Sequence, residues 1–281
     1  MKILINGANA VLAGEYIDPD IVFDCGQCFR FRKTGDTWTG VAHERVLTVR
    51  DTAEGLELIG AAKDAETIWR GYFDADRSYA DILKQLSSDE AVRMSAETFR
   101  GMRLLRQEPF ETLISFIISA NNNIKRIMGI IDALCRLAGR EIAPGMYAFP
   151  EPKAIAALEE HQLTECGAGY RAPYIVKTAR AVADGFDLEA LRAMDYIDAK
   201  KQLLTLYGVG PKVADCILLF SLDHGCAFPQ DVWIKRALAG IYGVSFKNDR
   251  ELVSFAREHF GDNAGIAQQY IFHYARTKGI E

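Results

Sequence analysis

The sequence lacks a long apolar segment and a recognisable leader. No run of about 18 apolar residues occurs, so the sequence predicts no membrane-spanning helix. The first twenty residues contain one lysine and soon turn acidic, unlike the basic stretch and apolar core of a signal peptide. These absences predict an intracellular protein, located in the cytoplasm or nucleoid of a bacterium or in the nucleus of a eukaryote.

Cysteine is scarce, with six residues in 281, so a disulfide scaffold is not expected. Cys25 and Cys28 form a single C-x-x-C pair, but no second pair follows and no Cys/His pair has zinc-site spacing. The surrounding FDCGQCFRF indicates a strand, and the closely spaced C-terminal cysteines of an iron–sulfur site are absent. The sequence therefore predicts no cofactor and no metal that the chemistry requires.

The chain also lacks an excess of basic residues. Its net charge is −5, which argues weakly against a nucleic-acid partner. The charge is uneven, however: residues 1–90 carry 10 basic and 16 acidic side chains, whereas residues 91–281 carry 23 and 22. Any contact with DNA is therefore expected in the second part, through local basic patches and backbone amides.

Two patterns of hydrophobic residues divide the chain. The first 60 residues or so mix β-branched and aromatic residues with partial alternation, as in TWTGVAHERVLTVR, which predicts antiparallel strands. Further on, apolar residues recur at helical spacing, most clearly on either side of the polar SANNN at 119–123. The prediction is an α+β chain, with an antiparallel-sheet domain over residues 1–95 and a helical domain over residues 96–281.

Residues 203–222, LLTLYGVGPKVADCILLFSL, predict a helix-hairpin-helix motif. Gly208, Val209 and Gly210 form the tight turn, since two glycines can adopt positive φ, and Pro211 suits the first turn of the second helix. The free amides of such a turn and the dipole of the following helix favour a phosphate. The hairpin would then hold a DNA backbone without reading its sequence. A plain helical hairpin in a core explains the same residues.

Two residues near this motif are candidates for chemistry. Lys212 lies in the first turn of the second helix, where the positive end of the dipole disfavours an ammonium and so favours a nucleophilic amine. Cys216 follows four residues later on the same helix face. Asp231 follows a proline-containing turn and precedes a predicted helix. Each also has a plainer explanation: Lys212 as a phosphate contact or solvated charge, and Asp231 as an N-cap.

These residues resemble a known superfamily. The sequence GVGPKVADC followed by FPQDV is similar to the helix-hairpin-helix DNA glycosylases, whose motif ends in a Gly/Pro-rich loop and an aspartate. A lysine at position 212 resembles the bifunctional members. Four further segments resemble the eukaryotic-type 8-oxoguanine DNA glycosylase/lyase family and cover most of the chain in that family's order: CGQCFRF, GMRLLRQEPFETLISFIISANNNIKRI, CGAGYRAPYI and AGIAQQYIFHYA.

The resemblance implies a base excision repair enzyme that removes 8-oxoguanine from duplex DNA and then nicks the strand. Lys212 would attack C1′ of the damaged nucleotide and form a Schiff base, from which β-elimination follows. Asp231 would stabilise positive charge developing on the sugar and help Lys212 act as a neutral amine. The damaged base would first have to leave the duplex, because its glycosidic bond is inaccessible in the stack.

Four residues are implied in binding the extruded base. The backbone carbonyl of Gly26 would accept the N7–H of 8-oxoguanine. Guanine carries an acceptor at N7, so this contact would be unmade, at a cost of about 1–3 kcal/mol. Gln268 would bond the Watson–Crick edge, and Phe272 and Cys216 would pack on the two faces. Plainer explanations are a strand kink at Gly26, a solvated Gln268 and a core Phe272.

Four other residues are implied around the partner base. Asn121 would fill the vacated space, and Tyr170 would wedge the stack. Arg126 and Arg171 would donate to O2 and N3 of cytosine, so Arg126 predicts a preference for cytosine opposite the lesion. Arg126 alone is equally consistent with a phosphate contact or a solvated charge. An optional structural cation site would be formed in the hairpin by the carbonyls of Leu204, Leu206 and Val209.

Two positions depart from the family pattern: Trp233 replaces a histidine common in relatives, and Cys28 replaces a serine. The phosphate contact of that histidine is therefore not carried over. Two other functions stay open: a glycosylase for another purine lesion, which would not explain Gly26, Gln268 and Phe272, and a non-catalytic DNA-binding protein, which needs neither Lys212 nor Asp231. The predicted partner is lesion-containing duplex DNA, and the predicted state is a monomer.

Overall fold

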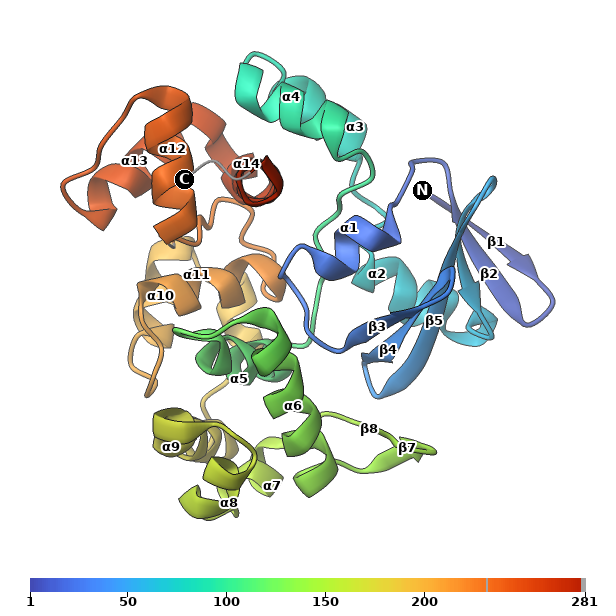
Figure 1. The fold of residues 1–281 in the computed structure, drawn as a ribbon, viewed down its shortest axis with the longest axis vertical. Helices are drawn as coiled ribbons and strands as arrows, with labels where there is room; N and C mark the ends of the chain where they lie inside the picture. Colours follow the sequence, from blue (N-terminus) through green and yellow to red (C-terminus); the bar gives the residue numbers. More distant parts are fainter. Residues whose placement is uncertain (231, 279–281) are drawn as a thin grey trace.

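The computed structural model describes residues 1–230 and 232–278. A six-stranded antiparallel sheet stands at one side, and helices make up the rest of the molecule (Figure 1). The strand order is β1-β2-β6-β5-β4-β3, and the bounds are β1 (Lys2–Asn6), β2 (Asn9–Ala13), β3 (Phe31–Thr34), β4 (Thr37–Ala42), β5 (Arg45–Thr52) and β6 (Gly55–Ile59). Alternate residues of β5 and β6, such as Leu47 and Leu58, are fully buried, as the period of a half-buried strand requires.

Residues 25–30 are not the strand that their sequence indicated. They form a loop between the short helix α1 (Pro19–Asp24) and β3. Asp18 caps α1, with Oδ1 accepting from the N–H groups of Asp20 and Ile21 at 2.9 and 3.3 Å. Gly26 has a φ of +85°, a left-handed conformation that glycine adopts freely and that takes the chain out of the helix. The aromatic residue that suggested a strand, Phe29, is buried within this loop.

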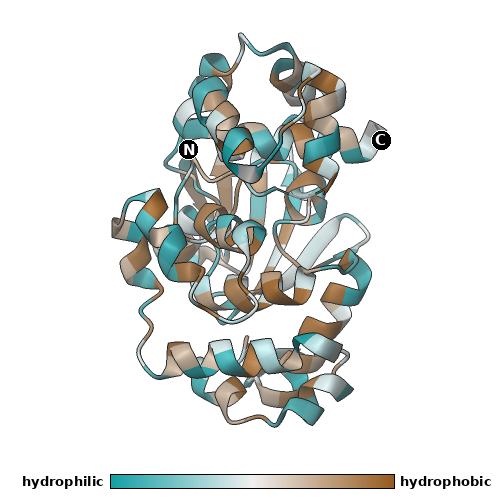
Figure 2. Cartoon of the chain, turned by 90° about the vertical axis from the view of Figure 1, so that its left-hand side faces the viewer, coloured by the Kyte–Doolittle hydropathy of each residue, from teal (hydrophilic) through white to brown (hydrophobic). Residues whose placement is uncertain are grey.

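The rest of the chain is mostly helical, which confirms the predicted α+β class. Figure 2 shows hydrophobic residues on the inward sides of these helices and polar residues outside. No helix in the parts that the structure describes is long and apolar enough to cross a membrane. The bounds are α2 (Arg70–Tyr72), α3 (Tyr79–Gln85), α4 (Glu90–Thr98), α5 (Pro109–Ser119), α6 (Ile124–Ala138), α7 (Pro152–Ala156), α8 (Glu160–Glu165), α9 (Ala172–Ala183), α10 (Tyr196–Leu203), α11 (Pro211–Phe220), α12 (Val232–Tyr242), α13 (Asp249–Phe260) and α14 (Ala264–Lys278), with a small hairpin of β7 (Glu141–Ala143) and β8 (Met146–Tyr147) after α6.

Two hydrophobic cores lie on the two sides of the molecule. One is enclosed by the sheet with α1 and α2, and the other joins the helices from α3 to α14. The cores are interleaved in sequence: Tyr79 and Val92, from α3 and α4, belong to the helical core, whereas the later Leu105 belongs to the sheet core. A domain boundary at residue 95 stays a prediction.

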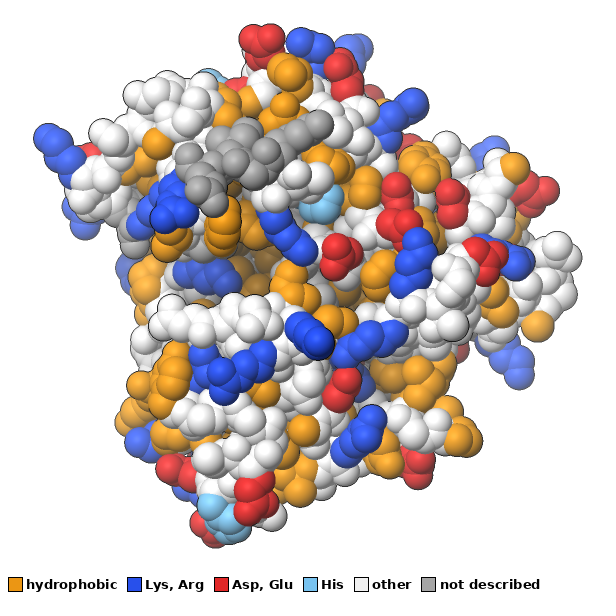
Figure 3. All heavy atoms as spheres, in the orientation of Figure 1, with side chains coloured by type: hydrophobic (Ala, Val, Ile, Leu, Met, Phe, Trp, Pro, Cys, Tyr) orange, Lys and Arg blue, Asp and Glu red, His pale blue; other side chains and the backbone are white. Residues whose placement is uncertain are grey.

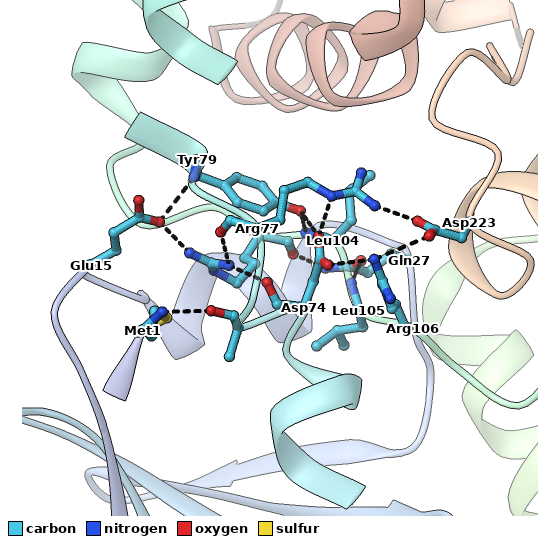
Figure 4. Close-up of polar contacts among 12 residues, drawn as sticks. Met1, Glu15, Gln27, Asp74, Arg77, Tyr79, Leu104, Leu105, Arg106 and Asp223 are labelled. Atoms are coloured by element: carbon cyan, nitrogen blue, oxygen red, sulfur yellow. Dashed lines mark hydrogen bonds and ion pairs between the residues drawn. The ribbon is translucent and has the colours of Figure 1, made fainter. Parts of the chain in front are cut away.

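The segment 102–107 connects the two cores through polar contacts (Figure 4). The Arg106 guanidinium pairs with Asp74 at 2.8 Å on the sheet side and with Asp223, just beyond α11, at 3.1 Å. The Gln107 N–H donates to the carbonyl of Phe220, the last residue of α11, at 2.9 Å. The sheet and the second helix of the predicted motif are therefore fixed relative to each other.

Candidate active site

The helix-hairpin-helix motif is present, with α10 and α11 as its helices and residues 204–210 as the hairpin. Of its two glycines, only Gly208 has a positive φ, +74°, whereas Gly210 has −90° and precedes α11 as its N-cap. The Thr178 hydroxyl of α9 donates to the Tyr207 carbonyl at 2.7 Å and holds the hairpin in place. No side chain of the described chain caps α11, so the first amides of that helix stay available to an anion.

Lys212 is the second residue of α11 and is half-buried. Its Nζ lies 5.2 Å from the centre of the Phe116 ring and 3.5 Å from the Ser119 hydroxyl, both on α5. No carboxylate forms an ion pair with Lys212 in the residues described. The amine is thus held against an aromatic face beside a weak polar partner, the Ser119 hydroxyl.

A buried ion pair fixes the helix that carries Lys212. Asp215 of α11 is fully buried, and its carboxylate accepts from Lys200 Nζ and from the Tyr196 hydroxyl, each at 2.8 Å. Both partners belong to α10, the first helix of the motif. Because a buried charge is tolerated only with such partners, this contact sets the orientation of α11 against α10.

The Gly26 carbonyl differs from the carbonyls on either side of it. Neighbouring carbonyls accept hydrogen bonds: Asp24 from Arg276 at 3.0 Å, Cys25 from Gln269 at 3.2 Å and Gln27 from Gln107 at 2.7 Å. The Gly26 carbonyl accepts none from any described residue. A Cβ at Gly26 would meet only the end of Ile124, at 3.9 Å, so the left-handed backbone and not crowding favours glycine here.

Helix α14 carries Gln268 and, one turn later, Phe272. It packs tightly on α11, since a Cβ on Gly265 would lie 2.1 Å from the Leu219 side chain. Gln268 is 4% exposed, so it is not the solvated residue of the plainer explanation, and its Oε1 is buried without a partner in the described chain. Phe272 is half-buried against the helical core, and Cys216 of α11 is 2% exposed. Hence α11, α14 and the Gly26 loop meet.

The three asparagines between α5 and α6 differ in their roles. Asn123 caps α6, accepting from the Arg126 N–H at 3.0 Å, and Asn122 donates to the Ile118 carbonyl at the end of α5, at 3.1 Å. Asn121 is exposed, with a φ of +48° that is uncommon for a residue with a side chain. The two neighbours thus stabilise the turn that exposes Asn121.

The residues predicted around the partner base lie at this turn. One of them, Arg171, forms hydrogen bonds within the protein. Tyr170 is 56% exposed, and Arg126 is exposed with a long 3.5 Å contact to the Gly167 carbonyl. Arg171, in contrast, is 3% exposed, and its guanidinium donates to the carbonyls of Ala120 and Asn121 at 2.9 and 3.0 Å. In this structure Arg171 supports the turn, and its contact with cytosine stays a prediction.

The remaining positions that the sequence singled out are those beyond Gln230, in the hairpin and in the Gly26 loop. Asp231 lies outside the described residues. Trp233 is 43% exposed in the first turn of α12, with the Arg236 guanidinium 5.8 Å from its ring centre. The Leu206 carbonyl of the predicted cation site accepts the Val209 N–H at 3.3 Å, and cation binding stays a prediction. Burial raises the pKa of both the Cys25 and Cys28 thiols, which are free.

Several supporting residues escaped the sequence analysis. Phe116 and Ser119 contact Lys212 from α5, and their spacing of three on one helix was the available signal. Gln107 and Gln269 bond the Gly26 loop from distant segments, and no local pattern identifies such partners. A cavity of about 630 Å³ lies between the sheet and the helical body, and none of the predicted site residues line it. A search for cavities would therefore have placed the candidate site at a different position.

The charge of the molecular surface agrees with a nucleic-acid partner. On the face shown in Figure 3 the surface is hollowed between the C-terminal helices and the α5–α6 region. Lys and Arg side chains border this hollow and continue across the middle of the face. A chain of net negative charge thus presents a locally basic face, as the uneven distribution of charge suggested.

Comparisons with known proteins identify the family. Residues 11–113 match the N-terminal domain of 8-oxoguanine DNA glycosylase, and residues 114–261 match the HhH-GPD superfamily of base excision DNA repair proteins. The chain is 33% identical over 276 residues to the N-glycosylase/DNA lyase OGG1 of Arabidopsis thaliana, covering 90% of this chain and 75% of the relative. It is 38% identical over 215 residues to a probable N-glycosylase/DNA lyase of Methanothermobacter thermautotrophicus, covering 68% and 69%.

A solved structure shares the whole fold. The 8-oxoguanine glycosylase/lyase of Clostridium acetobutylicum, in complex with double-stranded DNA containing cytosine opposite 8-oxoguanine, superposes with a TM-score of 0.95. The two proteins are 36% identical, and the match covers 100% of this chain and 99% of the other. The chain therefore belongs to the HhH-GPD superfamily of base excision DNA repair proteins and, within it, to the 8-oxoguanine DNA glycosylase family.

Proposed function

We propose that this protein excises 8-oxoguanine opposite cytosine in duplex DNA through a Schiff base on Lys212, and nicks the strand by β-elimination. It acts as a monomer on intracellular DNA and requires no cofactor. The sheet domain supplies Gly26, and the helical domain supplies the nucleophile and the contacts with DNA. Membership of the family and its DNA-bound relative support this proposal.

One observation carries the choice of lesion: where α11, α14 and the Gly26 loop meet, two acceptors have no donor among the described residues. No described residue donates to the carbonyl of the half-buried Gly26, and Gln268 Oε1 is buried without a partner in the described chain. An unsatisfied buried acceptor costs about 1–3 kcal/mol, so a ligand that supplies a donor is favoured. 8-Oxoguanine offers N7–H to one acceptor and the N–H groups of its Watson–Crick edge to the other. Guanine lacks the N7–H.

The chemistry begins after the base has left the stack. Lys212 Nζ attacks C1′, and the bond from C1′ to N9 breaks with its electron pair on the base, which takes up a proton. The nitrogen then loses a proton, the bond from C1′ to O4′ breaks as the sugar ring opens, and O4′ takes up a proton, which leaves the Schiff base between Nζ and C1′. Asp231 stabilises the positive charge that develops on the sugar. Loss of a proton from C2′ then expels the 3′ phosphate. The α11 amides and the hairpin at Gly208, Val209 and Gly210 grip the backbone without reading sequence.

The space left by the base is filled from the turn between α5 and α6. Asn121 enters the gap, and the exposed Tyr170 wedges the neighbouring stack. Arg126 is exposed and bears donors for O2 and N3 of cytosine, which sets the preference for that base. Arg171 takes part only if DNA binding releases it from the Ala120 carbonyl.

The proposal is tested with four duplexes that carry 8-oxoguanine opposite each base in turn. We expect base release and nicking in the wild type, fastest opposite cytosine, and a covalent complex after borohydride reduction. Lys212→Gln abolishes both the nick and the complex. The matched control is Lys201→Gln, an exposed lysine of the same motif, which retains both. Absence of base release and of a covalent complex with all four duplexes would refute the proposed activity.

A further inference from the structure

We propose that Gln269 and Gln107 are positioning residues that hold the Gly26 carbonyl in a fixed direction and so set the discrimination between 8-oxoguanine and guanine. Neither side chain needs to touch the base. The inference rests on the proposed base-reading role of Gly26 and adds the residues that make this role selective.

The pattern of hydrogen bonds around Gly26 supports this assignment. Gln269 Nε2 donates to the Cys25 carbonyl at 3.2 Å from one side, and Gln107 Nε2 donates to the Gln27 carbonyl at 2.7 Å from the other. Arg276 adds a third bond, to the Asp24 carbonyl at 3.0 Å. The carbonyls flanking Gly26 are therefore bonded, while that of Gly26 is left without a donor in the described chain.

The loop is also fixed from within. Gln27 is fully buried, and its Nε2 donates to the carbonyls of Val22 and Arg103, each at 2.9 Å. Its Oε1 accepts from the Leu105 N–H at 2.8 Å, a contact drawn in Figure 4. Gln107 lies in the same segment, 102–107, as Arg103 and Leu105. Its N–H donates to the carbonyl of Phe220, at the end of α11. The loop is thereby tied to the helix that carries Lys212.

Helix α14 completes this arrangement. Gln269 is 3% exposed and follows Gln268 directly, so adjacent residues hold the loop and face the proposed base site. A single rigid helix therefore sets the distance between the Gln268 amide and the Gly26 carbonyl. Both acceptors need such placement, because hydrogen bonds weaken steeply away from their preferred distance and angle.

Discrimination requires a carbonyl that cannot turn away. With 8-oxoguanine, the Gly26 oxygen receives N7–H, so a mobile loop would still find the bond. With guanine, two acceptors face each other, and a mobile peptide would relieve the repulsion by rotating. Glycine with positive φ has few steric barriers to such rotation. We call the bonds from Gln269 and Gln107 to the two carbonyls that flank Gly26 the clamp. The clamp acts mainly against guanine, so its loss should improve the binding of guanine more than it weakens the binding of 8-oxoguanine.

The test uses the full chain with Lys212→Gln, so that binding is measured without turnover. Dissociation constants are measured for two duplexes that differ only in 8-oxoguanine or guanine opposite cytosine. Adding Gln269→Met removes the donor at similar length and volume. We expect the ratio of the two constants to fall about three- to tenfold, the equivalent of one hydrogen bond. Gln107→Met, on the other side of the loop, should lower the ratio in the same direction.

The matched control is Tyr270→Phe, which removes a neighbouring buried contact of α14, from the Tyr270 hydroxyl to the Met102 carbonyl at 3.4 Å. It should leave the ratio unchanged. In proteins with an intact Lys212, borohydride trapping at a preformed abasic site, which has no base to read, reports whether the catalytic site is formed.

The outcomes separate the two claims. Unchanged ratios in both glutamine variants, with trapping at the abasic site preserved, would overturn the clamp and leave the proposed function standing. A wild type that traps at 8-oxoguanine no better than at guanine would overturn the proposed function, and the clamp with it. A fall in ratio in Gln269→Met and Gln107→Met but not in Tyr270→Phe supports the clamp.

Discussion

Gln268 and Gln269 are adjacent buried residues with opposite polar environments. Gln268 Oε1 lacks a partner in the described chain, whereas Gln269 Nε2 bonds the Cys25 carbonyl at 3.2 Å. An unmade buried bond destabilises the free protein, and a made one stabilises it. The orphaned acceptor is thus a stability cost that only a ligand with a donor would offset, as is typical of functional sites.

These environments predict opposite effects of one substitution on folding. Gln268→Met should raise the free energy of unfolding by about 1 kcal/mol, because it removes an unsatisfied acceptor, and should slow excision of 8-oxoguanine. Gln269→Met should lower the free energy of unfolding by a similar amount. Urea denaturation of the two variants and the wild type checks this. Destabilisation by Gln268→Met would contradict the view that its Oε1 is an unsatisfied acceptor in the protein without a ligand.

The type of a residue and its place in a motif are visible in the sequence, whereas its contacts are not. The sequence predicted Lys212 as the nucleophile, a role that stays a prediction, and the structure places its amine against the Phe116 ring. The resemblance implied that Arg171 donates to the partner base, which stays a prediction, and in the structure its guanidinium is buried against the turn carbonyls. An arginine in sequence does not reveal which carbonyls lie within reach, because these come from a segment about fifty residues earlier.

At the scale of elements, the hairpin depends on one glycine. Gly208 has a φ of +74°, and a Cβ there would lie 2.8 Å from the Tyr174 Cβ. Gly210 has a φ of −90°, and nothing lies within 4 Å of its Cβ position. The sequence showed only that both glycines can adopt positive φ, because either glycine of a GVG turn permits it.

Two alanine substitutions should therefore differ. Gly208→Ala forces an L-residue into a left-handed conformation, at about 1–2 kcal/mol, and crowds Tyr174. It should lower thermal stability and weaken binding to undamaged duplex at least tenfold. Gly210→Ala, with φ already negative, should leave stability within about 0.5 kcal/mol. Calorimetry and a binding titration distinguish the two. Equal losses in both variants would contradict the hairpin geometry.

Helices with strong amphipathic periods were predictable, whereas the loop at residues 25–30 was not. α5 begins at Pro109 as its first-turn proline suggested. FDCGQCFRF satisfies a strand pattern locally, but Asp18 caps the helix α1 and Gly26, with its positive φ, takes the chain out of that helix. Tertiary burial of Phe29 overrides the local β preference.

At the scale of the whole molecule, Glu15 joins the two cores. Its carboxylate, between β2 and α1, accepts from the N–H groups of Tyr79 and Ala80 at 3.0 and 3.2 Å and pairs with the buried Arg103. Burial alone would raise the pKa of Glu15, but these N–H groups and the guanidinium outweigh it and hold the pKa below 4.5. Contacts between residues so far apart in sequence are not visible in any local pattern.

The lowered pKa gives a pH dependence of known sign. The contribution of Glu15 is fully present above pH 4.5 and is lost as pH falls through its folded-state pKa. At pH 7, Glu15→Gln should lower the free energy of unfolding by about 1–2 kcal/mol. The difference from wild type should shrink below pH 4. Urea titrations at pH 7 and 3.5 measure it, with the exposed Glu54→Gln as control. A gap that widens in acid would contradict the assignment.

The central claim is that Lys212 forms the covalent intermediate, and peptide mapping tests it most directly. Wild-type protein is incubated with an 8-oxoguanine:cytosine duplex, reduced with borohydride and digested, and the modified peptide is sequenced by mass spectrometry. The account predicts one modified residue, Lys212, in the peptide that begins the second helix of the motif. A reduced adduct on any other amine, or an adduct that persists in Lys212→Gln, would contradict it.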